Sequence, residues 1–433
     1  MAIAWNRLGA LEASRLLQRR EITAVQLLRA CFARIEQRDG QLHAWTAIDQ
    51  AAALARAEAL DRGAITGPLH GLPFGVKDMF DTAGLPTRFG SAIYKHNQPA
   101  HDAAAVAECV AAGAIIAGKT VTTEFATYKP PPTRNPHGTA YSPGGSSSGS
   151  AAAVADHMVP FALGSQTAAS IVRPAAYCGV VGYKPTFGLV PRDGLKSLSR
   201  SLDTIGWFAR SVPDAALVAS VLLREPRLAE LPSTAAPRIG MYRSPQWRRT
   251  LPETRAALEH AASVFSRAGA IVEDVPLPQE YCSLVQLQSD VMAYEVAQSL
   301  EMERREHANQ LSTSLLALLE AGATISPAQH AANLQRAAET ADRVQGWFDR
   351  YDVLLSPSAT GEAPLAELGT GDPLFGRVWT MLGTPTVHLP FATGPQGLPV
   401  GLQAIGRRGD DHKLLAMSHW LQERLLAASE QVQ

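Results

Sequence analysis

The sequence has few cysteines and almost no net charge. Its four cysteines, Cys31, Cys109, Cys178 and Cys282, stand far apart, with no CxxC pair and no histidine cluster nearby. This spacing argues against a zinc site and against a disulfide framework, so we expect the thiols to be reduced, buried and inert. The formal net charge of −1 over 433 residues gives no electrostatic reason to bind nucleic acid or an anionic membrane. A small-molecule substrate is the expected partner.

Long apolar runs are also missing. The first residues, MAIAWNRLGALEASRL, lack a basic segment followed by an apolar one, and no stretch reaches the length of a membrane span. We therefore expect a cytoplasmic protein without a membrane contact. With 46% hydrophobic and 18% charged residues the composition is that of a globular chain. The length allows two or three domains, or one large α/β unit.

Helical and strand patterns alternate along much of the chain. Residues 23–39 begin with a capping threonine and repeat apolar residues at helical spacing. Residues 104–120 predict a helix that ends near Gly113 and then a short buried strand, and the same order recurs in 253–278. Such alternation predicts helices packed on a central sheet. Residues 280–350 are almost wholly helical, and we interpret them as a variable helical cap over the pocket.

The stretch YSPGGSSSGSAAA, Tyr141 to Ala153, allows two interpretations. Glycine and serine are typical of a flexible linker. They also let the backbone approach a ligand closely, and a glycine/serine turn that leads into a helix directs N–H groups towards a developing negative charge. The apolar segment that follows, AAAVADHMVPFALGS, is suited to burial, which does not favour a linker. The stretch by itself does not decide between the two.

A nucleophile elbow, GxSxG, is matched by Gly145-Ser146-Ser147-Ser148-Gly149. It would make Ser147 the nucleophile, with His388 or His412 and a distant acid as partners. The elbow requires a strand directly before the turn. Pro143 cannot donate to a strand ladder, so the match is poor.

A phosphate-binding loop, GxxxxGK[ST], is matched letter for letter by residues 113–120. In a true loop of this kind the middle residues are open and a helix follows. Here the middle residues, Ala-Ile-Ile-Ala, predict a strand instead. We therefore interpret the match as accidental.

Lys77 is the best candidate for a general base among the seven lysines. It follows an apolar, strand-like run in HGLPFGVKDMFDTAG, where burial would disfavour the charged amine and lower its pKa. A neutral lysine amine can accept a proton. The alternative, a lysine at a strand end paired with Asp78 or Asp81, is by itself commoner. The serine cluster favours the base.

Three blocks of the sequence resemble the amidase signature family of serine hydrolases. They are HGLPFGVKD around Lys77, PGGSSSGSAAAVA from Pro143, and LGSQTAASIVRPAAYCGVVGYKPTFGLVP from Leu163. Supporting matches are AGAIIAGKTVTTEF, SLDTIGWFARSVPD, YDVLLSPSA, LGTPTVHLP and GLPVGLQAIG. Together they extend the resemblance over most of the chain, residues 280–350 excepted.

The resemblance implies an α/β fold, the amidase signature fold, in which a central mixed and twisted sheet is covered by helices on both faces. It implies a single amidase domain over residues 1–433, with a core at about 60–240 and 350–425 and the helical cap at about 280–350. No cofactor and no metal are expected. A homodimer is left open as the assembly state.

The resemblance also assigns catalytic roles. It implies that Lys77 is the base, that Ser146, held by an unusual cis peptide, relays the proton, and that Ser170, 24 positions further on, is the nucleophile. Backbone N–H groups of the turn Thr167-Ala168-Ala169-Ser170 would stabilise the oxyanion. The glycine/serine stretch is then active-site backbone rather than a linker.

Several positions depart from the commonest family pattern. Ala168 and Ala169 replace the usual Gly-Gly, and an alanine would be strained there if its φ were positive. Gln166 stands where many members have aspartate, and Arg173 falls three residues after the nucleophile rather than two. With the triple serine, these two features resemble malonamidase-type members, in which the arginine recognises a substrate carboxylate. We expect Gln166, Arg173 and Ser147 to bind substrate. For Arg173, a contact with a carbonyl or an acidic side chain in the core stays open.

The expected function is that of a serine amidohydrolase that cleaves C–N bonds through an acyl-enzyme on Ser170. Members of the family hydrolyse small amides, aryl amides, fatty amides, ureas or carbamates, and the sequence does not choose among them. A carbamate or urethane substrate is one hypothesis. Two further interpretations remain open. One is the glutaminase-type component of a transfer-RNA amidotransferase, which works with a partner. The other is a non-catalytic nucleotide-binding protein, suggested by the GKT match.

Overall fold

A single mixed sheet organises the molecule. The computed structural model describes residues 4–276 and 278–430. Within them, eleven strands form one sheet in the order β1-β3-β2-β4-β6-β5-β10-β11-β9-β7-β8. The strands are β1 (Trp45–Ala47), β2 (Pro73–Lys77), β3 (Ile115–Thr120), β4 (Phe161–Gln166), β5 (Val181–Lys184), β6 (Thr204–Ala209), β7 (Arg238–Met241), β8 (Ile271–Asp274), β9 (Val353–Pro357), β10 (Thr386–Thr393) and β11 (Pro399–Ile405). The pairs β2/β3, β2/β4, β7/β8 and β7/β9 are parallel, and the remaining pairs are antiparallel.

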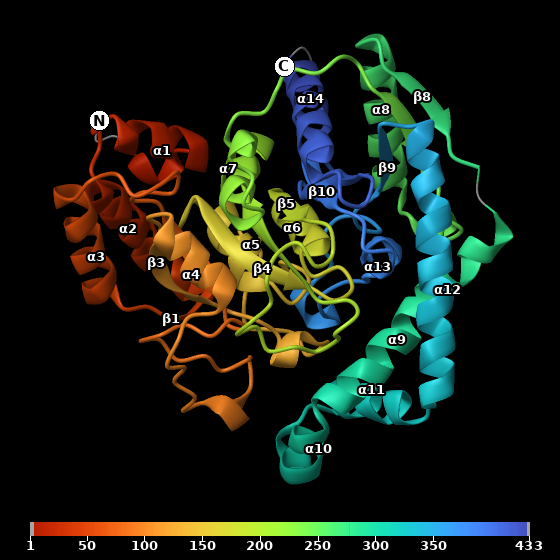
Figure 1. Ribbon diagram of the computed structural model, residues 1–433, viewed down its shortest axis with the longest axis horizontal. Coiled ribbons are helices and arrows are strands. Elements are labelled where there is room, and N and C mark those ends of the chain that lie inside the picture. Colours follow the sequence, from red (N-terminus) through yellow and green to blue (C-terminus); the bar gives the residue numbers. More distant parts are fainter. Residues whose placement is uncertain (1–3, 277, 431–433) are drawn as a thin grey trace.

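Helices surround this sheet (Figure 1). In the described residues they are α1 (Ala10–Gln18), α2 (Ala24–Leu42), α3 (Gln50–Arg62), α4 (Ala104–Ala111), α5 (Ser148–Ala155), α6 (Val172–Cys178), α7 (Val212–Leu222), α8 (Pro252–Arg267), α9 (Leu284–Ser299), α10 (Glu301–His307), α11 (Thr313–Ala323), α12 (Pro327–Gln345), α13 (Leu374–Met381) and α14 (Asp411–Glu430). Helix α7 packs against α4 and α14, and α14 packs against α8, while α5 packs against α6.

Two adjacent residues of β5 show that helices cover both faces of the sheet. Successive side chains of a strand point to opposite faces. A Cβ atom on Gly182 would lie 2.5 Å from the Cβ of Ala175 on α6. The next residue, Tyr183, donates its hydroxyl to Asp411 at the start of α14, at 2.5 Å. Helices α6 and α14 therefore lie on opposite faces, and the predicted α/β architecture is confirmed.

The segments whose sequence patterns predict helices and strands form those elements in the structure. Thr23 caps α2 in a capping box, in which its side chain accepts from the N–H of Gln26 and the Gln26 side chain accepts from the N–H of Thr23. Residues 104–120 form α4 and then β3, and residues 253–278 contain most of α8 and all of β8. Because residues 115–120 are a strand, the GKT match is not a phosphate-binding loop.

The two strands that carry the candidate site are buried along their whole length. All residues of β2 and β4 are buried, and Phe74 stacks on Phe161 across the pair with ring centroids 5.1 Å apart. The two strands are parallel neighbours, so their carboxyl ends meet at one edge of the sheet. Lys77 ends β2 and Gln166 ends β4. Residues far apart in the sequence are thereby brought together at this edge.

The segment predicted as a helical cap consists of α9 to α12. In Figure 1, α12 runs along the right side of the molecule and α10 lies at the bottom. Helix α9 packs against α11, α12 and α13. Since α13 also contacts the turn Thr167–Ser170 described below, α9 is the part of this segment that comes nearest to the candidate site.

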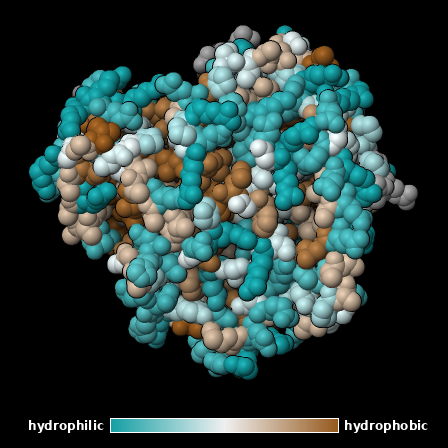
Figure 2. Space-filling view, in the orientation of Figure 1, coloured by the Kyte–Doolittle hydropathy of each residue, from teal (hydrophilic) through white to brown (hydrophobic). Residues whose placement is uncertain are grey.

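The surface drawn in Figure 2 is mostly hydrophilic, with hydrophobic side chains gathered mainly in the central left part of this face. Cys31, Cys109 and Cys178 are buried as expected, but Cys282 is exposed. It lies in the short turn Gln279–Ser283 ahead of α9 rather than in the core. Over residues 4–276 and 278–430, no helix is both long enough and apolar enough to span a bilayer.

Candidate active site

Lys77 is fully buried and contacts two serines. Its Nζ donates to Ser146 Oγ at 2.8 Å and to Ser165 Oγ at 2.9 Å, and it lies 3.3 Å from the Ser165 carbonyl oxygen. Burial lowers the pKa of Lys77 to about 7, although the negative charge of Asp203 acts in the opposite direction. A large fraction of the amine is therefore neutral near pH 7, and a neutral amine can accept a proton.

Burial alone does not single out Lys77. Lys119 and Lys184 are also completely buried. Burial lowers their pKa values to about 8 and about 7, against the opposing effect of nearby aspartates. Lys119 donates to the hydroxyls of Thr82 and Thr87, and Lys184 donates to a neighbouring backbone carbonyl. Among these three lysines, only Lys77 contacts the glycine/serine stretch, so its position distinguishes it.

Ser146 and Ser170 lie next to each other, but their contact runs through the backbone. The N–H of Ser146 donates to Ser170 Oγ at 3.4 Å. Among the described residues, the two hydroxyls do not hydrogen-bond to each other. Ser146 is 2% exposed and Ser170 is 8% exposed. Little solvent therefore reaches either hydroxyl.

The turn before Ser146 is made by two glycines with positive φ, 81° at Gly144 and 58° at Gly145. A Cβ on Gly145 would lie 2.7 Å from the ring of Pro174 and 3.3 Å from the Cα of Ser170, so only glycine allows this approach. All peptide bonds of the described residues are trans, which corrects the expectation of a cis peptide at Ser146. A trans bond avoids the cost of about 3–4 kcal/mol that a cis bond before a non-proline residue carries.

Hydrogen bonds to three of its carbonyl groups hold the backbone of the turn Thr167–Ser170 in place. The carbonyl of Thr167 accepts from Gln288 Nε2 at 2.8 Å, that of Ala168 accepts from Thr380 Oγ1 at 2.7 Å, and that of Ala169 accepts from a backbone N–H of α6. In the described part of the chain, the N–H groups of Ala168, Ala169 and Ser170 donate to no protein acceptor. Such fixed and unpaired N–H groups are suited to stabilise a negative oxygen.

The two alanines of this turn are not strained. Neither Ala168 nor Ala169 has a positive φ, so the turn does not need the Gly-Gly of the commonest family pattern. Helix α13 makes room for the extra methyl group with a glycine. A Cβ on Gly376 would lie only 2.6 Å from the Cβ of Ala169. The backbone of α13 therefore lies directly against the turn Thr167–Ser170.

The side chains of Gln166 and Ser147, predicted to bind substrate, are instead engaged in the fold. Gln166 is 1% exposed; its Oε1 accepts from the N–H groups of Ile171 and Val172, and its Nε2 donates to Thr380. Ser147 is completely buried and donates to the Ser165 carbonyl at 3.2 Å. Both side chains fix the backbone around Ser170, so neither side chain is free to contact a substrate.

Of the two roles considered for Arg173, the structure shows the contact with a carbonyl in the core. It is 4% exposed, and its Nη1 donates to the carbonyl of Gly371, ahead of α13. Its Nε is buried without a hydrogen-bond partner among the described residues. The guanidinium therefore has unused donor capacity, although part of it holds a backbone carbonyl.

The alternative site built on Ser147 is not assembled. His388 is completely buried and lies 2.6 Å, Nδ1 to Oγ, from Ser358 rather than near Ser147. His412 is the second residue of α14, on the face of the sheet opposite to α6. No strand leads into Gly145 among the described residues. The elbow interpretation is therefore wrong.

Sequence reasoning did not identify Ser165 and Asp203 as site residues. Ser165 accepts from Lys77, and Asp203 accepts the Thr167 hydroxyl at 2.7 Å and two backbone N–H groups. Both stand in quoted family blocks, LGSQT and SLDTIG. Their role depends on the pairing of β4 with β2 and β6, and no local signal could have revealed it.

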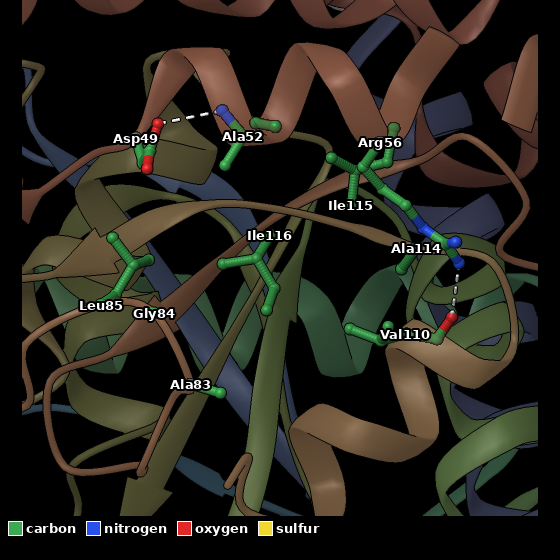
Figure 3. Close-up of a pocket in the computed structure, with 11 residues that line it drawn as sticks. Asp49, Ala52, Arg56, Ala83, Gly84, Leu85, Val110, Ala114, Ile115 and Ile116 are labelled. Atoms are coloured by element: carbon green, nitrogen blue, oxygen red, sulfur yellow. Dashed lines mark hydrogen bonds between the residues drawn. The ribbon is translucent and has the colours of Figure 1, made fainter. Parts of the chain in front are cut away.

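The cavity shown in Figure 3 lies elsewhere. It has a volume of about 210 Å³ and is lined by the first part of α3, the loop 83–85, the end of α4 and the start of β3. Two hydrogen bonds join residues of its wall. The N–H of Ala52 donates to the Asp49 carboxylate, and the Arg56 guanidinium donates to the carbonyl of Val110. Neither Lys77 nor the two serines line it, so this cavity does not mark the candidate site.

Comparisons with known proteins identify the family of the chain. The Amidase family model matches residues 26–415. The chain is 32% identical to the A subunit of the glutamyl-tRNA(Gln) amidotransferase of Carboxydothermus hydrogenoformans, over 95% of this chain and 96% of that protein. It is also 32% identical to the putative amidase AmiD of Mycobacterium tuberculosis, over 97% and 94%. A crystal structure of an amidase superimposes with a TM-score of 0.89 at 33% identity, covering 96% of this chain and all of the other. The chain therefore belongs to the amidase signature family of amidohydrolases, as its sequence resemblance implies.

Proposed function

We propose that this protein is a serine amidohydrolase in which Ser170 is the nucleophile, Ser146 relays the proton and Lys77 is the base. The observation that carries the proposal is the contact of the buried Lys77 amine with Ser146 Oγ at 2.8 Å, directly beside Ser170. The site needs no metal or cofactor for this chemistry, because a hydroxyl, a neutral amine and backbone N–H groups supply the nucleophile, the base and the oxyanion contacts.

The first step forms the acyl-enzyme. Ser170 Oγ attacks the carbonyl carbon of the amide, its proton passes to Ser146 Oγ, and Ser146 gives its own proton to the neutral Nζ of Lys77. This relay requires the Ser146 hydroxyl to turn from its contact with Lys77 alone to a contact with both partners. The carbonyl oxygen becomes negative and accepts from the free N–H groups of the turn Thr167–Ser170.

The second half of the reaction returns the proton. As the C–N bond breaks, the proton held by Lys77 passes through Ser146 to the leaving nitrogen, and a neutral amine departs. Water then attacks the ester formed on Ser170 and gives up its proton along the same path, which releases the carboxylic acid and restores the enzyme. The pKa of about 7 for Lys77 suits both directions of transfer near neutral pH.

Intact-mass analysis after exposure to a fluorophosphonate tests the assignment. We expect one covalent adduct on the wild type, an unchanged adduct on Ser147→Ala and none on Ser170→Ala. Ser147→Ala is a matched control because it removes a hydroxyl from the same glycine/serine stretch. An adduct that follows Ser147 would contradict the proposal.

The proposed substrates are small amides, aryl amides or carbamates, including urethanes. All three present a carbonyl carbon of the same electrophilic kind to Ser170. Release of aniline from an N-aryl carbamate, compared with release from the corresponding acetanilide, separates them. If aniline appears only from the anilide, the carbamate part of the proposal is wrong.

The similarity to a component of a glutamyl-tRNA(Gln) amidotransferase supports a second candidate, a glutaminase-type A subunit that works with a partner. Ammonia release from small amides by the isolated chain favours the stand-alone hydrolase, whereas activity on glutamine only within a complex would favour the amidotransferase component. Either assignment uses the same residues of the site.

A further inference from the structure

Helix α9 holds the first residue of the turn Thr167–Ser170 directly. Gln288 of α9 is completely buried, and its Nε2 donates to the Thr167 carbonyl at 2.8 Å. A peptide group is planar, so the Thr167 carbonyl and the Ala168 N–H belong to one rigid unit. The bond from Gln288 therefore fixes the direction of the Ala168 N–H, which donates to no protein acceptor in the described part of the chain.

A second side chain of α9, that of Glu295, holds the loop between β5 and β6. Glu295 follows Gln288 by about two helical turns, so the two side chains share one face of α9. Glu295 is 9% exposed. Its Oε2 accepts the Ser199 hydroxyl and the Ser201 N–H, the latter at 3.0 Å, and its Oε1 accepts the Ser201 hydroxyl at 2.6 Å. His330 of α12 lies 3.3 Å from the same Oε1. Three hydrogen bonds thus join the Glu295 carboxylate to one loop.

Asp203 ties this loop to Thr167. Its Oδ2 accepts the N–H of Leu198 at 2.8 Å and the N–H of Ser199 at 3.0 Å. Its Oδ1 accepts the Thr167 hydroxyl at 2.7 Å. Ser199 is completely buried and contacts both carboxylates, Glu295 through its hydroxyl and Asp203 through its N–H. A continuous path of hydrogen bonds therefore runs from Glu295 to Thr167.

Helix α9 thus holds Thr167 at two points, its carbonyl through Gln288 and its hydroxyl through the loop 197–203. Hydrogen bonds to a carboxylate are roughly twice as strong as those between neutral groups, so the path through two carboxylates is a firm one. We propose that Glu295 is a positioning residue. Through the loop it fixes Thr167, and it thereby keeps the Ala168 N–H directed at the carbonyl oxygen of the substrate.

This role rests on the proposed function, in which the N–H groups of the turn Thr167–Ser170 stabilise the oxyanion. Glu295 itself contacts neither the substrate nor the reacting atoms. The helical segment interpreted as a cap then does more than cover the pocket, because α9 takes part in setting the rate of the chemical step.

Replacement of Glu295 by methionine removes its three hydrogen bonds to the loop and keeps a side chain of similar length. We expect kcat to fall at least about tenfold, a part of the roughly 100–1000-fold that loss of a whole oxyanion donor costs. KM should change little, because the contact acts mainly on the transition state. Glu295→Gln should keep most of kcat, since its amide oxygen can still accept from Ser199 and Ser201. A wild-type kcat in Glu295→Met would overturn the proposal.

A double-mutant cycle tests the path. If Glu295 acts through the Thr167 hydroxyl, loss of that hydroxyl makes Glu295 dispensable. In the background of Thr167→Val, Glu295→Met should therefore change kcat by less than about twofold. A purely structural role would lower kcat by the same factor in both backgrounds, and that result would overturn the proposal. Ser199→Ala, which removes only the hydroxyl bound to Glu295, should show the same dependence on Thr167 and replaces Glu295→Met if that variant does not fold.

Glu303→Met is the matched control. Glu303 is a 1% exposed carboxylate of the next helix, α10, and it accepts from the Tyr94 hydroxyl at 2.8 Å and from Lys196 Nζ at 2.6 Å. Neither partner hydrogen-bonds to the turn Thr167–Ser170 in the described residues. Its effect on kcat should be the same with and without the Thr167 hydroxyl. A dependence as strong as that of Glu295→Met would overturn the proposal, because the cycle would then report a general loosening of the helical segment.

Hydrogen exchange measured by mass spectrometry separates this role from the proposed function. The amides of residues 167–173 should exchange faster in Glu295→Met than in the wild type and in Glu303→Met, because the turn is held less firmly. Faster exchange without hydrolysis of any amide by the wild type would support the positioning role and reject the proposed function. Hydrolysis by the wild type, with unchanged exchange and additive effects on kcat, would do the reverse.

Discussion

Replacing Ser165 by alanine tests how the protein sets the pKa of Lys77. Ser165 Oγ accepts from Lys77 Nζ at 2.9 Å, a contact that stabilises the charged amine. A hydrogen bond to a charged group contributes about 1.5–3 kcal/mol, and about 1.4 kcal/mol corresponds to one pKa unit. We use the lower bound because the Ser165 carbonyl and Ser146 remain as acceptors. Ser165→Ala should therefore lower the pKa of Lys77 from about 7 by about one unit.

The assay is the pH profile of kcat/KM for an amide, which reports ionisations of the free enzyme. In the wild type the activity should rise from acid towards mild alkali, with its midpoint near the Lys77 pKa of about 7. In Ser165→Ala the acid limb should shift to a pH that is lower by about one unit. The neutral fraction of Lys77 at pH 6 then increases about fivefold.

Ser148→Ala is the matched control for this experiment. Ser148 belongs to the same stretch and is completely buried, but its hydroxyl has no hydrogen-bond partner in the described residues. Its acid limb should coincide with that of the wild type. An acid limb in Ser165→Ala that keeps its pH midpoint or shifts to higher pH would refute the reasoning, because Ser165 would then not stabilise the charged form of the Lys77 amine.

Two further results follow from the contacts of the site. Thr380→Val removes the hydroxyl that holds the Ala168 carbonyl at nearly constant volume. It should lower kcat more than it raises KM, and an unchanged kcat would show that the turn does not need this contact. The second result concerns stability, measured by urea unfolding of Ser170→Ala. Lys77, Lys119 and Lys184 have folded pKa values of about 7, 8 and 7, below the usual 10.5. The unfolded chain therefore binds more protons above pH 7, and the free energy of unfolding should rise from pH 7 to 8.5. A free energy of unfolding that stays constant over this range would mean that the lysines remain charged in the folded protein.

Local patterns in the sequence determined many of the helices and strands and pointed to Lys77 as the candidate base. The capping box at Thr23, the strand at residues 115–120 and the apolar run before Lys77 each depend on neighbours within a few residues, so their outcome could be read directly. The resemblance then placed Lys77, Ser146 and Ser170 in one site, and the structure brings them together. The elbow match was poor because no strand was expected before Gly145, and the phosphate-loop match was poor because a strand was expected at residues 115–120. Over the described residues, the structure shows the same two features.

Tertiary structure alone decided which residues surround this site. Ser165 reaches Lys77 because β4 pairs with β2, and Asp203 reaches Thr167 because β6 pairs with β4. Thr380, which donates to the Ala168 carbonyl, stands more than 200 residues after Ser170, in a helix whose sequence LFGRVWTM gives no sign of a site. A helix or strand pattern records which face of an element is buried, but not which distant element buries it. For that physical reason the proposed reacting groups could be named from the sequence, whereas only the packing of α9 and α13 on the turn Thr167–Ser170 revealed which side chains hold the carbonyls of that turn.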